Sequence, residues 1–175
     1  MRVQRIVSDL RVFSRDQQPE NRIWFKIEDE IEVSLRLLQH RITSNIQITK
    51  SFNFLELFYG NNSRLGQVFM NLISNAVEAI PESVEKGMLT IKTEKIEDKV
   101  VITVIDNGLG IPEKYQSELF EPFFTTKTQE KGMGLGLSIC YGIVTEHGGT
   151  ISFETTVGEG TAFTIELPYS TKEEN

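Results

Sequence analysis

Several residue types that mark particular classes of protein are scarce in this sequence. A single cysteine, Cys140, excludes an internal disulfide and indicates a reducing compartment. Lysine and arginine total 18 against 25 aspartates and glutamates, and the formal charge of −7 argues against a nucleic-acid-binding surface. No apolar run approaches the length of a membrane span, and the first residues show no signal-peptide pattern. We therefore expect a cytoplasmic segment without membrane contact of its own, whether or not a longer parent protein is membrane-anchored.

The composition is that of one globular domain with a short appendage. Hydrophobic residues make up 39% of the 175 residues, which is enough to bury a core. In the first fifteen residues, apolar side chains recur at the three- and four-residue steps of a helix that packs against other helices: Val3, Ile6, Leu10 and Phe13. The polar stretch that follows contains Pro19 and ends this pattern. We place a helix end in residues 1–18 and a separate domain in residues 19–175.

The rest of the chain alternates between strand and helix patterns. Strands are expected at 22–27, 45–52, 55–59, 88–96, 99–106, 149–157 and 160–168, the last two as a hairpin. Helices are expected at 28–39, 61–80 and 134–146. The loop-rich stretch from 107 to 133 is long for a compact domain, and such loops are more often functional than idle. The pattern predicts a mixed α/β layer of about five strands with helices packed on one face.

The helix expected at 61–80 carries two stripes. The apolar stripe predicts its core face: Leu65, Val68, Phe69, Leu72, Ile73, Ala76 and Ile80. The polar stripe lies roughly opposite: Arg64, Gln67, Asn71, Asn75 and Glu78. A solvated face is the simpler interpretation of Arg64, Gln67 and Glu78. Asn71 and Asn75 differ, because asparagine is a mediocre helix former and its neutral amide oxygen can hold Mg²⁺ beside a polyphosphate without adding charge.

A nearly continuous apolar strand ends at Asp106, in "VIDNGLGIP". A carboxylate in this place lies at the edge of a pocket and can accept a hydrogen bond from a ligand amino group. A strand that simply ends in an Asp-Asn-Gly turn is the plainer alternative. Downstream, Phe120, Phe123 and Phe124 lie in an irregular stretch, and we expect them to anchor the loop or to cover a ligand.

Three glycines occupy alternate positions across the start of the helix expected at 134–146: Gly132, Gly134 and Gly136. Alone, they fit two interpretations. One is a flexible linker. The other is a backbone that closely approaches an anion at a helix N-terminus, where free N–H groups and the helix dipole favour negative charge.

Taken in order, five motifs resemble the nucleotide-binding boxes of sensor histidine kinases: "NLISNA", "DNGLGIP", "LFEPFFTTK", "GMGLGLSI" and "GEGTAF". These kinases belong to a superfamily that includes type II topoisomerases and mismatch-repair ATPases. The resemblance runs from about residue 24 to residue 168, and the ordered set is far more specific than any one motif. The first helix is similar to the end of the second helix of the family's dimerisation and histidine-phosphotransfer domain.

The resemblance implies a two-layer α/β sandwich of the Bergerat type that binds ATP and Mg²⁺, with an ATP lid at about 107–133. It assigns the following residues to the nucleotide: Asn71, Asn75, Asp106, Gly108, Gly110, Ile111, Phe120, Thr125, Thr126, Lys127, Gly132, Met133, Gly134, Leu135, Gly136, Leu137 and Thr161. Asp106 would accept from the adenine amino group, and Thr161 would support this through water. Gly108 and Gly110 would let the backbone pass the adenine closely.

At the phosphate end, the resemblance makes Asn75 the Mg²⁺ ligand, places Asn71 one turn earlier, and lets the three alternating glycines cradle the phosphates. The chain departs from the family pattern in two places. Met133 stands where many members have threonine or serine, and Glu78 stands where many have a basic residue. Lys127 in the lid is the expected substitute charge, so Asn71 and Lys127 are the expected catalytic residues.

The implied activity is transfer of the γ-phosphoryl group from Mg-ATP to a histidine on a separate dimerisation domain, in a two-component sensor kinase. Water-splitting relatives carry a glutamate base at the position of Asn71, and an amide cannot take a proton from water. Neither His40 nor His147 stands in an acceptor context, so we expect the acceptor to lie outside this segment. Expected partners are that domain of a homodimeric parent and a downstream response regulator. An anti-sigma-type serine kinase and a nucleotide-sensing module without transfer remain alternatives.

Overall fold

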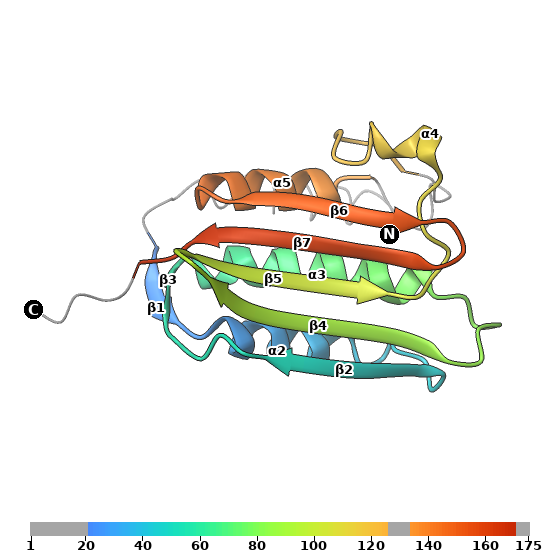
Figure 1. Ribbon diagram of the computed structural model, residues 1–175, viewed down its shortest axis with the longest axis horizontal. Coiled ribbons are helices and arrows are strands. Elements are labelled where there is room, and N and C mark those ends of the chain that lie inside the picture. The colour runs from blue at the N-terminus through green and yellow to red at the C-terminus, as the bar shows by residue number, and fades with distance from the viewer. Residues whose placement is uncertain (1–20, 126–133, 171–175) are drawn as a thin grey trace, which may run out of the picture.

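The computed structural model describes residues 21–125 and 134–170 (Figure 1). The strands are β1 (Ile23–Phe25), β2 (Ile46–Phe52), β3 (Phe58–Gly60), β4 (Gly87–Ile96), β5 (Lys99–Asp106), β6 (Thr150–Thr156) and β7 (Gly160–Pro168). The helices are α2 (Ile27–Leu38), α3 (Asn62–Ala79), α4 (Glu113–Gln116) and α5 (Gly136–Glu146). Several expectations lie outside the described residues: the helix end in 1–18, Thr126, Lys127, Gly132 and Met133.

Five strands form one mixed sheet in the order β2-β4-β5-β7-β6. β2 and β4 are parallel and the other neighbours are antiparallel, while β1 and β3 make a separate two-stranded sheet. Helices α2, α3 and α5 lie along one side of the large sheet, behind the strands in Figure 1. The expected α/β sandwich with helices on one face is confirmed.

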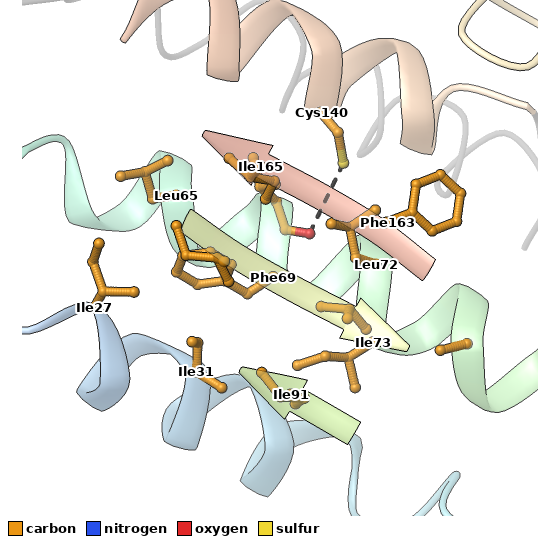
Figure 2. Close-up of a cluster of buried hydrophobic side chains, with 14 of the residues drawn as sticks. Ile27, Ile31, Leu65, Phe69, Leu72, Ile73, Ile91, Cys140, Phe163 and Ile165 are labelled. Atoms are coloured by element: carbon orange, nitrogen blue, oxygen red, sulfur yellow. Dashed lines mark hydrogen bonds between the residues drawn. The ribbon is translucent and has the colours of Figure 1, made fainter. Parts of the chain in front are cut away.

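The core lies between α3 and the inward side chains of the central strands. The whole apolar stripe of α3 is buried, as its spacing predicts. Figure 2 shows Leu65, Phe69, Leu72 and Ile73 pointing toward the sheet residues and α2, with Cys140 of α5 on the far side. Across this layer the Cys140 thiol lies 3.9 Å from the carbonyl oxygen of Val68, and burial raises the thiol pKa to about 12. A cysteine in this environment is a core residue.

Local sequence sets the ends of α3. Its N-cap is Asn61, whose side-chain oxygen accepts the backbone N–H of Arg64 at 3.1 Å. The helix stops at Ala79, two residues before Pro81, as the proline predicts. Among the described residues, no helix is both long and apolar enough to cross a bilayer.

Several boundaries differ from the sequence-based expectation, and three differences affect the loop or the small sheet. α5 begins at Gly136 rather than at 134, because Gly134 has a φ of +71°, outside the right-handed helical region. The short helix α4 interrupts the loop expected from 107, and it follows Pro112, whose φ of −57° suits the start of a helix. The strand expected at 55–59 forms only at Phe58–Gly60, where it pairs with β1.

Candidate functional site

Asp106 ends the central strand β5 and is buried, with 5% of its surface exposed. Its Oδ1 accepts the backbone N–H of Gly108 at 2.8 Å, and the backbone N–H of Thr161 on β7 also favours the ionised form. Burial outweighs both contacts and raises the pKa of the carboxyl to about 6. Asp106 is therefore ionised at neutral pH but poorly solvated, so it will bind a hydrogen-bond donor strongly.

The turn after Asp106 is packed against two other elements. A Cβ on Gly108 would lie 2.3 Å from the carbonyl oxygen of Ala79, and one on Gly110 would lie 2.2 Å from that of Thr156. The Leu109 N–H also donates to the Ala79 oxygen at 3.0 Å. The chain's own packing thus requires glycine at both positions, and the predicted approach of the backbone to adenine remains a prediction.

Beside Asp106, two threonines link the loop to the β6–β7 hairpin. The hydroxyl of Thr155 donates to the Gly160 carbonyl at 3.0 Å and accepts the Ile111 N–H at 2.9 Å. Because its one proton is used, the hydroxyl of the buried Thr161 must donate in the 3.0 Å contact with Thr155. Thr155 was missed from the sequence, although strand alternation and its pairing with Thr161 across the hairpin could have indicated it.

Asn71 joins α3 to the first residue of α5. Its Nδ2 donates to the Gly136 carbonyl at 3.2 Å, and a Cβ on Gly136 would lie 3.7 Å from the Asn71 side chain. Among the described residues, no side chain caps this helix end: the N-cap Leu135 forms no such bond, and the first turn contains no acidic residue. A helix N-terminus of this kind is suited to an anion.

The polar stripe of α3 faces α5 rather than solvent, so the solvated interpretation of Arg64 was wrong. Arg64 pairs with Glu146 at the far end of α5, with Nη2 and Oε2 separated by 2.6 Å. α5 covers this flank of α3, where Gln67, Asn71 and Asn75 are half-buried. Glu78, in contrast, is exposed as expected, and it forms an ion pair with Arg41.

The three loop phenylalanines have different environments. Phe120 contacts Tyr141 and Phe153, with ring centroids 5.9 and 6.0 Å apart. Phe124 contacts Tyr115 at 5.8 Å, whereas Phe123 is 70% exposed. Two of the three therefore anchor the loop, whereas Phe123 does not, and its alternative role of covering a ligand stays a prediction.

The remaining predicted site residues flank the segment 126–133. A Cβ on Gly134 would lie 2.4 Å from the Phe124 carbonyl oxygen, so the described residues before and after that segment lie close together. Thr125 and Leu137 are half-buried and Leu135 is buried. In the described part of the chain, no three His, Cys, Asp or Glu residues gather to hold a metal ion.

The two histidines differ in access. His40 is exposed, with Nδ1 3.1 Å from the Leu37 carbonyl oxygen. His147 is half-buried: its Nε2 accepts the Asn61 N–H at 3.1 Å, so Nδ1 donates to the Ile143 carbonyl at 2.8 Å. Burial lowers the pKa of His147. Because the ring is neutral, it adds no positive charge at the C-terminal end of the α5 dipole.

α3 connects the two clusters described above. Asn71, Asn75 and Ala79 follow one another at four-residue steps and so share one face over about 12 Å of helix. The first contacts the start of α5 and the last contacts the turn after Asp106. In Figure 1 the end of β5, the end of α3 and α4 lie at the same end of the molecule, opposite β1 and β3.

Residues 60–171 match the family described as histidine kinase-, DNA gyrase B- and HSP90-like ATPases. Sporulation kinase C of Bacillus subtilis is 37% identical over 173 residues, which are 95% of this chain. The chain spans only 38% of that relative's length.

Solved structures agree with this assignment. The catalytic domain of the histidine kinase ThkA has a TM-score of 0.73 at 36% identity, over 85% of this chain and 95% of that domain. ThkA in complex with the response regulator protein TrrA gives 0.73 at 31% identity, over 97% of this chain and 48% of the ThkA chain. The chain therefore belongs to the histidine kinase-, DNA gyrase B- and HSP90-like ATPase family, and within it to the group of sensor histidine kinases.

Proposed function

We propose that this chain is the ATP-binding catalytic part of a two-component sensor kinase, and that it donates the γ-phosphoryl group of Mg-ATP to a histidine on the parent's dimerisation domain. The observation that carries the proposal is the buried carboxylate of Asp106 near the C-terminal end of α3. The uncapped start of α5 contacts α3 about two turns before that end, at Asn71. Such a pair of sites suits a ligand with an amino group at one end and anionic oxygens at the other.

At the adenine end, Asp106 accepts from the exocyclic amino group. The hydroxyl of Thr161 lies next to this carboxylate in the paired strand and serves as a second polar contact. Gly108 and Gly110 hold the turn in place, and the half-buried Ile111 and Phe120 would offer apolar surface to the base.

At the phosphate end, the start of α5 offers backbone N–H groups from Leu135, Gly136 and Leu137. The donor set fits Mg²⁺ only with phosphate oxygens included, because Asn75 offers a single neutral amide oxygen and the described residues hold no acidic cluster. Mg²⁺ would neutralise charge on the transferred group. Thr125 lies at the edge of this region, and the roles of Thr126, Lys127, Gly132 and Met133 are predictions.

The residues beside the proposed phosphate site favour transfer to a histidine over transfer to water. Asn71 donates to Gly136 and has no basic atom with which to activate water. Transfer therefore depends on positioning and charge neutralisation, and it waits for a strong nucleophile. His147 cannot be that acceptor, since both of its ring nitrogens are engaged.

A nucleotide-sensing module without transfer is the second candidate. The ion pair of Glu78 with Arg41 favours this second candidate. In this pair Glu78 neutralises a positive charge one turn along α3 from Asn75. On either proposal the partner would be the parent's dimerisation domain. Because ThkA has been solved with a response regulator, such a regulator is the proposed next acceptor.

The test is incubation with γ-labelled ATP, with and without the acceptor-histidine helical hairpin of the same parent. We expect label on the hairpin, none on this chain, and little free phosphate. Acid-labile label on the chain alone would make His40 an acceptor, or would show that the hydrogen bonds of His147 do not exclude it. Nucleotide binding without label on the hairpin would favour the sensing module, and no binding would refute both.

A further inference from the structure

The C-terminal end of α5 contacts α3 and the residue before β1, at the end of the molecule opposite Asp106. Arg22, just before β1, donates from Nη2 to the Glu146 carbonyl oxygen at 2.9 Å. The Glu146 side chain pairs with Arg64 of α3, as described above. His147 accepts the N–H of Asn61, the N-cap of α3. We call these five residues the α5 junction.

The α5 junction is closely packed around a neutral imidazole. Its ring bridges α5 to the start of α3, and a Cβ on Gly60 would lie only 3.1 Å from its Cδ2. Other carbonyls of this helix end are occupied by backbone donors, since the N–H groups of Gly148 and Gly149 bind Thr145 and Val144. The Glu146 carbonyl instead takes the arginine, a cation at the negative end of the helix dipole.

α5 connects this junction to the proposed phosphate site. It has 11 residues and is therefore about 16 Å long. Cys140, fully buried, holds its middle against Val68, and Asn71 holds its first residue. Because α5 is one continuous helix held at its middle, a tilt at its C-terminal end would move the N–H groups at its start.

We infer that Arg22 is a positioning residue for the nucleotide site, acting through α5. This inference rests on the proposed function. Arg22 immediately precedes β1, so its guanidinium links the start of β1 to the helix at the proposed phosphate site. By linkage, nucleotide bound at the start of α5 strengthens the Arg22 contact at its end.

The test compares Arg22→Ala, Arg22→Lys and the control Arg36→Ala. Arg36 is an exposed arginine on α2, so its variant removes the same charge without touching α5. The Arg22 bond is exposed, which leaves the fold intact in the variant. Calorimetry gives the affinity for Mg-ATP. Hydrogen exchange gives the exchange rates of the backbone amides of residues 143–149, with and without nucleotide.

We expect Arg22→Ala to lose about two- to tenfold in affinity relative to Arg36→Ala, the range of one hydrogen bond. Exchange in the last turn of α5 should rise, and nucleotide should protect it less than in the wild type. Arg22→Lys, which can still donate to the carbonyl, should recover most of both effects.

Equal affinities of Arg22→Ala and Arg36→Ala would overturn the inference while leaving the proposed function standing. A lower melting temperature without a change in affinity would do the same, because it would make Arg22 merely structural. A wild type that binds no Mg-ATP would refute the proposed function itself and this inference with it.

Discussion

The Nδ2 of Asn71 donates a 3.2 Å hydrogen bond to the carbonyl oxygen of Gly136, the residue with which α5 begins. An amide in this position orients the helix start without adding negative charge. A carboxylate there would accept rather than donate, and it would repel both the Gly136 carbonyl and a phosphate. The contact therefore favours an anion site at the start of α5. A nucleotide also needs a residue that binds its base at the opposite end of the site.

We propose Asp106 for that role, so Asp106→Asn should weaken ATP binding by about 1.5–3 kcal/mol, the range of a charge-assisted hydrogen bond. The reason is that the amide keeps the shape of the side chain but loses its charge. Calorimetry with ATP measures the change. Asp98→Asn is the matched control, because Asp98 is exposed near the β4–β5 turn and should bind ATP like the wild type. Unchanged affinity in Asp106→Asn would remove Asp106 from the site.

The free energy of unfolding should depend on pH through the titration of Asp106. Its pKa is raised from 3.8 to about 6 in the folded protein, so between these values the folded state binds more protons than the unfolded state. The stabilisation from protonated Asp106 is complete below about pH 4 and is lost as pH rises through 6. Wild-type unfolding free energy, relative to Asp106→Asn, should fall by up to about 3 kcal/mol over this window. A constant difference in urea titrations would contradict it.

ATP affinity should change with pH in the opposite sense. The ionised carboxylate is the form that accepts from the amino group, so wild-type affinity should rise as pH increases through about 6. Dividing by the affinity of Asp106→Asn at each pH removes the titration of the nucleotide's own phosphates. Parallel profiles for the two proteins would show that Asp106 does not titrate in the site.

Asn75→Ala should reduce the benefit of Mg²⁺ more than it reduces metal-free binding. The amide oxygen of Asn75 is the proposed protein ligand, and the side chain lies on the turn between Asn71 and Ala79. ATP titrations with Mg²⁺ and with EDTA give the two affinities, and we expect the ratio to fall about fivefold or more, equivalent to about 1 kcal/mol. Gln67→Ala, on the same flank of α3, is the control. Equal losses with and without metal would make Asn75 a general pocket residue.

The sequence predicted the elements well because their patterns are strong. The apolar stripe of α3 and the alternation of β4 and β7 come from burial on one face, which periodicity records. The position of α5 relative to α3 was not predictable in this way. Arg64 was misassigned to solvent, because spacing along one helix gives a shared face but not the neighbour that covers it.

Sequence motifs were enough to name Asp106 and Asn71 as site candidates, and their roles toward a nucleotide stay predictions. Thr155 could not be named in this way, since its contacts arise only when β6 pairs with β7 and brings it next to Thr161. Glycines raised a different difficulty. Gly108 and Gly110 look like ligand contacts in the sequence, yet backbone atoms of Ala79 and Thr156 already require them.

His147 should make stability fall below about pH 6.5. Its pKa is lowered in the fold by burial and by the nearby Arg22 and Arg64, partly offset by the Ile143 hydrogen bond and by Glu146, so below 6.5 the unfolded state takes up a proton first. His147→Ala leaves the Asn61 N–H unpaired and should cost about 1–3 kcal/mol at pH 8. The wild type should lose this advantage as pH falls. His40→Ala is the control, because His40 is exposed and should change stability by less than about 0.5 kcal/mol at either pH.

Gly134→Ala should destabilise the protein more than Gly158→Ala, although both glycines have positive φ, +71° and +83°. An alanine in this region of φ costs about 1–2 kcal/mol in either place. At Gly158 no described atom lies within 4 Å of the added Cβ, so that cost is the whole effect. At Gly134 the Cβ would also lie 2.4 Å from the Phe124 carbonyl oxygen, so one of the two backbones must move. Urea denaturation measures the difference, and hydrogen exchange at residues 120–125 should rise only in Gly134→Ala. Equal stability of the two variants would show that the contact between Gly134 and Phe124 does not hold this part of the loop.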